Sequence, residues 1–398
     1  MIARRWLHEA EVIGLVAALV LAGCCRDTTG TYGVLEQRRS AVARPGPPSG
    51  DPLLGDRQES IRFVQSSADG SRFLVGVRTA SSRHRIWVVG PSGAIQDSVD
   101  GRLQLDDLTT RYPTFSPADP SKILLSGSAP PDSTTFTTDL YVYDLSTQGL
   151  RRVTDVPENG RAHFGTFLPD GRHIVYLFRP YGEPAQVRLI DTTGSEDPTI
   201  LASLPPRQWS EPPYAVFPDG NRLVYADDGR LVLVDLTTGT STPLTADSSA
   251  TVRSPRVSPG GSHVLFRVRT PGRGESLRRL EVPTGTQDVI DRTGTGTVDL
   301  RSDRRFFSAR FAGSARRVVY GIFTDTTDAR TGARSPSRLF VRDLRRSRGR
   351  VELGTGLARN DLDVTAPFTG QQIALFSDGN RVLFVGRRTY SFCAPTTF

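Results

Sequence analysis

Apolar residues recur at every second position in short runs that are separated by turn-forming residues. The clearest stretch holds four such runs: Pro213–Phe217, Arg222–Ala226, Arg230–Leu236 and Thr240–Leu244. Pro218–Gly220 separates the first two, and proline presets φ there while glycine accepts positive φ. Alternation with a period of two is typical of half-buried strands. The stretch therefore predicts a four-stranded antiparallel meander.

The same succession recurs along the chain. Its first turn is centred on Asp69, Asp119, Asp170, Asp219, Gly260, Gly313 and Asp378. Sheet-sized repeats with a period of roughly 40 to 50 residues are typical of β-propellers. One such sheet cannot bury both faces alone, but a ring of stacked sheets can. We predict an all-β fold over residues 61–398, a β-propeller of four-stranded antiparallel blades. Seven blades are expected, with six or eight as alternatives.

The last repeat has too few strands to complete a blade. A third strand is expected around Thr389–Ala394, and the chain then ends at Phe398 with no fourth. Thr31–Arg38 has the pattern of a strand and lies near the other end of the chain. We hypothesise that this N-terminal segment supplies the missing fourth strand.

The repeats resemble those of a known family. Phe115–Pro117 reads F-S-P and Phe217–Gly220 reads F-P-D-G, and each is followed by a strand of mainly aliphatic residues. These forms are similar to the aromatic-Ser-Pro-Asp-Gly repeat of TolB-type propellers. Related propellers occur in prolyl-oligopeptidase-like peptidases, in some lyases and in cell-envelope binding proteins. The resemblance implies the fold and leaves the function open.

The N-terminus has the pattern of an export signal. An apolar run from Val12 to Ala22 follows two arginines and is too short for a permanent transmembrane helix. The end of the run, Leu21–Cys24, resembles the bacterial lipobox, which implies a signal peptide over 1–23 and a lipid on Cys24. An ordinary secretory signal with a chance cysteine is the alternative. Residues 24–60 then form a tether that is rich in proline. A lipoprotein on the periplasmic face of the outer membrane or on the cell surface is expected.

The composition and charge of the chain limit the kinds of partner that are expected. The chain has 38 Gly and 28 Pro, which argues against long helices, and a formal charge of +8. For an exported protein the relevant anions are envelope polymers, lipid headgroups and acidic proteins rather than nucleic acid. Besides Cys24 only Cys25 and Cys393 are present, too few for a disulfide scaffold. A monomeric propeller is expected.

The long connecting segments gather on one rim of the predicted propeller. The turns between first and second strands, and between third and fourth strands, are mostly tight, whereas the other connections are long. Long loops on a rigid scaffold are the usual place for binding, although solvated insertion is an equal alternative. Acidic residues in two of these loops, Asp325, Asp328, Asp361 and Asp363, are candidate binding residues. Their spacing differs from that of an EF-hand, so structural calcium is not favoured.

Three residues near the starts of first strands are candidates for the mouth of the axial channel: Arg111, His163 and Glu211. One histidine is too few for a metal site, so no metal or other cofactor is predicted. His173 and His263 open second strands at equivalent positions, where structural roles are expected. The chain has no G-x-S-x-G or H-E-x-x-H motif.

These patterns favour binding over catalysis. We expect a non-catalytic scaffold that binds an envelope protein or polymer on the long-loop rim. The alternative is a metal-assisted lyase or hydrolase that acts on a carbohydrate or peptide at the channel mouth.

Overall fold

The computed structural model describes residues 12–13, 31–37, 60–67, 71–78, 84–90, 94–99, 113–128, 137–205, 211–246, 249–271, 274–293, 305–312, 316–323, 337–345, 350–357, 373–375 and 381–386. Every regular element within these ranges is a β-strand. No helix in this part of the chain is long and apolar enough to cross a membrane.

Six four-stranded antiparallel sheets are each built from strands that are consecutive in the chain. Blade 1 holds β3 (Ser60–Ser66), β4 (Phe73–Arg78), β5 (His84–Val89) and β6 (Ile95–Ser98), and blade 2 holds β7 (Thr114–Phe115), β8 (Lys122–Gly127), β9 (Asp139–Asp144) and β10 (Gly149–Arg152). Blade 3 holds β11 (Arg161–Phe167), β12 (His173–Arg179), β13 (Ala185–Asp191) and β14 (Thr199–Leu204), and blade 4 holds β15 (Tyr214–Val216), β16 (Arg222–Asp227), β17 (Arg230–Asp235) and β18 (Ser241–Pro243). Blade 5 holds β19 (Thr251–Val257), β20 (His263–Thr270), β21 (Gly274–Glu281) and β22 (Gln287–Arg292), and blade 6 holds β23 (Arg305–Ala312), β24 (Arg317–Phe323), β25 (Ser337–Asp343) and β26 (Arg350–Leu357).

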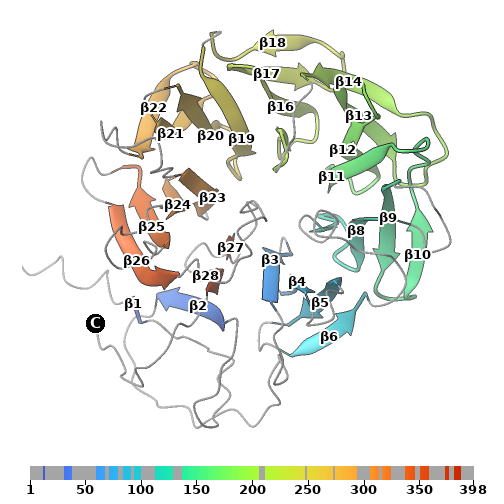
Figure 1. Ribbon diagram of the computed structural model, residues 1–398, viewed down its shortest axis with the longest axis horizontal. Coiled ribbons are helices and arrows are strands. Elements are labelled where there is room, and N and C mark those ends of the chain that lie inside the picture. The colour runs from blue at the N-terminus through green and yellow to red at the C-terminus, as the bar shows by residue number, and fades with distance from the viewer. Residues whose placement is uncertain are drawn as a thin grey trace, which may run out of the picture.

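The blades stand around a central axis (Figure 1). First strands such as β3, β11, β19 and β23 lie towards the centre, and fourth strands such as β6, β10, β18 and β26 lie at the periphery. The predicted all-β propeller of four-stranded antiparallel blades is therefore confirmed. The first strands begin at one edge of the ring, which we call the loop rim. The opposite edge, where first strands turn into second strands, is called the turn rim.

A further sheet joins the two ends of the chain. Its order is β1 (Val12–Ile13), β2 (Thr31–Gln37), β28 (Arg381–Gly386) and β27 (Ile373–Leu375). It lies between blade 6 and blade 1, with β27 and β28 beside β3 (Figure 1). We call it the closing sheet.

The closing sheet corrects the count of seven blades made from consecutive repeats. Six blades have four consecutive strands, whereas the last repeat contributes only β27 and β28 among the described residues. β2 pairs directly with β28, from Thr31 opposite Gly386 to Glu36 opposite Arg381. It occupies the third position, where the sequence pattern placed it fourth, because the free edge of β28 offers the backbone groups that it pairs with. The predicted strand at 389–394 lies outside the described residues.

Apolar side chains fill the spaces between successive blades. Leu74 and Ile86 of blade 1 pack with Ile123 and Tyr141 of blade 2, and all four are buried. Four further clusters join blades 2 and 3, 3 and 4, 4 and 5, and 5 and 6 in the same way. Each blade thus covers a face of its neighbour, which explains why apolar residues alternate in every repeat.

Buried hydroxyl groups link neighbouring blades through hydrogen bonds. The Tyr214 hydroxyl of blade 4 donates to the Val175 carbonyl of blade 3 at 2.9 Å and also contacts the Phe164 carbonyl. Burial raises the pKa of Tyr214 above its ordinary value, so the hydroxyl keeps its proton. In blade 6 the Tyr320 hydroxyl lies 2.7 Å from Asp291 Oδ2 of blade 5. These bonds fix the relative position of adjacent sheets.

On the turn rim, aspartate side chains form hydrogen bonds within their own turns. Asp235 Oδ1 accepts hydrogen bonds from the backbone N–H groups of Thr237 and Thr238, both at 2.9 Å. Asp191 Oδ1 accepts hydrogen bonds from the Thr193 hydroxyl and from the Thr193 backbone N–H, and these bonds lower the pKa of the Asp191 carboxyl. Gly220 adopts φ +74° in the turn predicted at Pro218–Gly220. The predicted tight turns are therefore present, and their side chains are used within the turns.

One connection on the loop rim is shorter than the sequence pattern indicates. The sequence of Arg269–Ser276, with one proline and two glycines, predicts a long loop. In the structure β20 and β21 continue to pair as far as Thr270 opposite Gly274. Gly274 adopts φ +79°, which lets the chain turn tightly at this point.

Candidate functional site

Two of the predicted mouth residues are described, and they lie in different blades. His163 is part of β11 in blade 3, where its side chain is buried and its ring centroid is 6.0 Å from that of Phe164. Glu211 precedes β15 in blade 4 and is also buried. Its carboxylate pairs with Arg267 of blade 5. The structure therefore uses Glu211 in a contact between blades.

The remaining candidates stay predictions. Cys24, Arg111, Asp325, Asp328, Asp361 and Asp363 lie outside the described residues. Nothing in the described part of the chain tests them.

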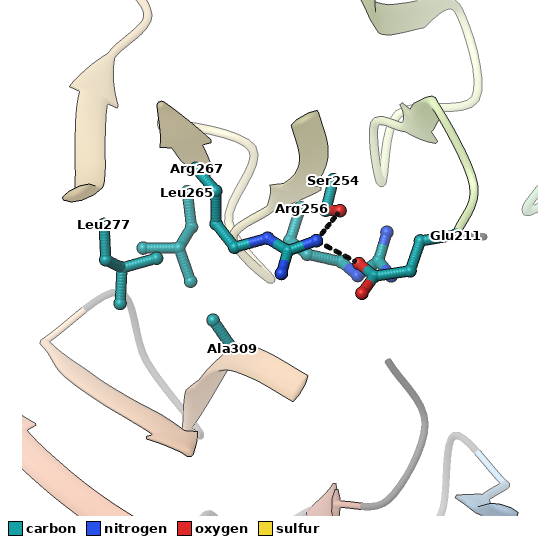
Figure 2. A pocket seen from close by; sticks show the side chains of 7 residues that line it. All are labelled: Glu211, Ser254, Arg256, Leu265, Arg267, Leu277 and Ala309. Atoms are coloured by element: carbon teal, nitrogen blue, oxygen red, sulfur yellow. Dashed lines mark hydrogen bonds and ion pairs between the residues drawn. The ribbon is translucent and has the colours of Figure 1, made fainter. Parts of the chain in front are cut away.

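Arg267 is the centre of a buried cluster of charges. Its Nη2 atom lies 2.9 Å from Glu211 Oε2 and donates a 2.7 Å hydrogen bond to Ser254 Oγ. Its Nε atom is 3.9 Å from Glu275 Oε1. Figure 2 shows the guanidinium extending from β20 between Ser254 and Glu211. Only 12% of the Arg267 side chain and 8% of each glutamate side chain is exposed, so solvent screens these charges weakly.

An irregularity in β19 brings Ser254 into the cluster. The register between β19 and β20 shifts between Arg253 and Arg256, and Ser254 adopts φ +52°. Such a bulge changes the direction in which a side chain points. In blade 3, β11 has a corresponding shift after His163, and Phe164 adopts φ +56°. The bulge is thus a repeated feature of these inner strands, and in blade 5 it places a hydroxyl beside Arg267.

The cluster borders a small pocket between blades 4, 5 and 6. The pocket is lined by Glu211, Ser254, Arg256, Leu265, Arg267, Leu277 and Ala309 (Figure 2). The space that water can occupy is about 10 Å³, which is room for roughly one water molecule. At this pocket Arg267 contacts both Glu211 and Ser254. The arrangement therefore serves as a charged joint between blades and is too small to hold a sugar or a peptide.

No metal centre is visible in the described residues. Within these ranges no three His, Cys, Asp or Glu side chains lie close enough together to hold a metal ion. His173 and His263, expected to have structural roles, bond locally. The Nδ1 atom of His173 lies 2.6 Å from Asp170 Oδ2, and that of His263 lies 2.8 Å from Ser262 Oγ.

The sequence pattern indicates Glu211 but not Arg267 or Glu275. The sequence does set Arg267 apart, because the residue at the corresponding position of other second strands is small or apolar. Ser126, Leu177, Ala226 and Gly321 occupy it in blades 2, 3, 4 and 6. A charge at a position of this kind predicts a buried partner of opposite sign.

The loop rim also carries an exposed aromatic residue. Tyr181 lies in the connection between β12 and β13, and 84% of it is exposed, more than any other large hydrophobic residue in the described part of the chain. Gly182 follows with φ +76°. Pro180 and Pro184 restrict the same five-residue connection. The ring is therefore displayed on a short, constrained loop.

No protein-family model matches the chain, and no curated protein matches it. Solved structures do resemble it. The oligogalacturonate lyase from Vibrio parahaemolyticus is 12% identical, with coverage of 90% of this chain and 97% of the lyase and a TM-score of 0.56. An oligogalacturonate lyase in complex with manganese is 13% identical, with coverage of 91% and 95% and a TM-score of 0.56. A putative TolB from Agrobacterium tumefaciens is 15% identical, with coverage of 84% and 92% and a TM-score of 0.44.

The likeness to the lyases extends over nearly the whole of each chain. At such low identity it concerns the propeller fold, and a fold of this kind carries many unrelated functions. TolB structures are among the matches, as the F-S-P and F-P-D-G repeats led us to expect.

Proposed function

We propose that this chain is a non-catalytic binding propeller of the bacterial cell envelope. Its mature form, which lacks residues 1–23 and with them β1, is anchored by a lipid on Cys24 and docks a protein partner on the loop rim. The observation that carries the proposal is the exposed ring of Tyr181 on a constrained loop of that rim. Tyrosine is enriched in protein interfaces because it offers a large contact area with little conformational freedom to lose.

The contrast between the two rims supports the choice of surface. On the turn rim, carboxylates such as Asp191 and Asp235 bond to the backbone of their own turns. On the loop rim, Tyr181 is exposed and the long connections predicted from the sequence would surround it. The loop rim therefore offers a partner an exposed aromatic ring, whereas these carboxylates of the turn rim are already used within their turns.

Photocrosslinking tests the docking surface. A photoreactive phenylalanine analogue replaces Tyr181 in the full chain, which is expressed in a bacterial envelope. We expect a discrete crosslinked protein band from this position, because the partner covers the exposed ring. The band is measured by immunoblotting and identified by mass spectrometry.

A matched probe at Thr238, which is exposed on the turn rim, serves as the control and should give no such band. Crosslinking from Thr238 but not from Tyr181 would refute the proposed surface. Metal analysis of the purified protein distinguishes this proposal from the alternative enzyme. Stoichiometric bound metal that is lost in the His163→Ala variant would favour a metal-assisted enzyme.

Lipidation of Cys24 gives an independent test of the anchor. In cells fed an alkyne-tagged fatty acid, the full chain should incorporate the label and sediment with membranes. Cys24→Ala should abolish both, because the thioether requires the thiol. Cys25→Ala is the matched control and should be labelled normally. Labelling that persists in Cys24→Ala would overturn the assignment.

A further inference from the structure

Two arginines face each other at the loop rim of blade 3. Arg161 opens β11, Arg179 ends β12, and the two are register partners. Side chains directly opposite on antiparallel strands point to the same face with Cβ atoms about 5 Å apart. Among the described residues neither guanidinium has a hydrogen bond or an ion pair with a carboxylate.

Other arginines of the described structure do have a carboxylate partner. Arg152 pairs with Asp139, Arg222 with Asp219 and Arg230 with Asp227. Like charges directly opposite on adjacent strands destabilise a sheet. Burial and then the charge of Arg161 lower the pKa of the Arg179 guanidinium from its ordinary value. The pair therefore gives the fold no evident stabilisation.

The surroundings hold the pair in place. Thr138 of blade 2 forms a bridge with Arg161, with its carbonyl 2.7 Å from the Ala162 N–H. On the other side, Leu177 shares their face of the sheet and packs with Tyr214 and Leu223 of blade 4. The backbone under both arginines is therefore fixed by neighbouring blades.

Nearby carboxylates do not neutralise the pair. Glu211, at the same rim of blade 4, is paired with Arg267 of blade 5. Glu158 and Glu183, on the loops beside Arg161 and Arg179, are exposed and form no ion pair in the described structure. Two guanidiniums without a carboxylate partner in the described structure thus lie at strand ends next to the connection that carries Tyr181.

We propose that Arg161 and Arg179 bind carboxylates of an acidic peptide segment of the docked protein, with Tyr181 packing against the same segment. The inference rests on the proposed function and specifies the chemistry of its partner. Planar guanidiniums bind carboxylates through two parallel hydrogen bonds. A peptide fits better than a neutral or purely charged polymer, because tyrosine and arginine together are typical of the centre of protein interfaces.

Fluorescence anisotropy with defined probes tests the proposal on the full chain. The probe is a labelled peptide of alternating glutamate and leucine, and its matched partner has glutamine in place of glutamate. We expect the acidic peptide to bind, with an affinity that falls as salt is added, and the glutamine peptide not to bind. The Arg161→Gln/Arg179→Gln variant should bind about tenfold or more weakly, since each charge-assisted bond contributes substantially.

A control variant, Arg172→Gln/Arg316→Gln, removes the same charge from exposed positions on the turn rim and should bind as the unmodified chain does. Equal binding by both variants would overturn the site. Tighter binding of an alginate oligomer than of the peptide, lost in Arg161→Gln/Arg179→Gln, would overturn the peptide assignment in favour of a polysaccharide. If Tyr181 crosslinks to a protein and no acidic probe binds, this inference fails while the proposed function stands.

Discussion

Removing β2 is expected to destabilise the propeller strongly. A deletion of residues 31–37 takes away the strand that pairs with β28 at six positions. Cross-strand pairs contribute roughly 0.2–1 kcal/mol each, so the free energy of unfolding should fall by about 1–6 kcal/mol. The deletion also leaves β27 and β28 as a two-stranded remnant between blade 6 and blade 1, and two strands alone are marginal. Thermal unfolding followed by circular dichroism measures the loss.

The control deletes seven residues, 42–48, from the segment that the sequence predicts to be a tether. Its melting temperature should match that of the unmodified chain. A milder variant, Val34→Pro/Leu35→Pro, keeps the chain length and should lower the melting temperature as well, because proline cannot donate to the ladder. Equal stability of all four chains would show that β2 does not hold the ring together.

The sequence predicts most of the fold because the repeats are local. The runs at Arg222–Ala226 and Arg230–Leu236 correspond closely to β16 and β17, and their turns contain the expected glycines. The position of β2 is harder to predict, since its partner β28 is more than 340 residues away along the chain. Pattern alone shows that Thr31–Arg38 is a strand but not which edge it joins.

The candidate site is less predictable for a related reason. Glu211 stands out because it precedes a first strand, but its partner comes from the second strand of the next blade. Pairing between blades depends on how the bulge at Ser254 directs the inner strand, and that backbone change has no clear sequence signal. The register of Arg161 and Arg179, which is needed to see them as a pair, also emerges only from the folded sheet.

Replacing Arg267 with methionine should have the other large effect. The change keeps much of the side-chain volume but leaves Glu211 and Glu275 buried without the guanidinium between them. Breaking a buried ion pair by removing one partner costs about 3–5 kcal/mol, because the remaining charge is neither solvated nor compensated. Ser254 Oγ also loses its hydrogen bond. Chemical denaturation should show a lower midpoint with an unchanged dependence on denaturant concentration.

The neutral triple variant Glu211→Gln/Arg267→Met/Glu275→Gln separates charge from packing. It removes the whole cluster while keeping similar shapes, and such replacements are often neutral for stability. Its free energy of unfolding should therefore be restored to nearly that of the unmodified chain. Arg269→Met, an exposed arginine on the same strand, should change stability by no more than about 0.5 kcal/mol. If the triple variant is as unstable as Arg267→Met, the loss comes from packing, and the charges that Glu211 and Glu275 keep after Arg267 is removed are not its cause.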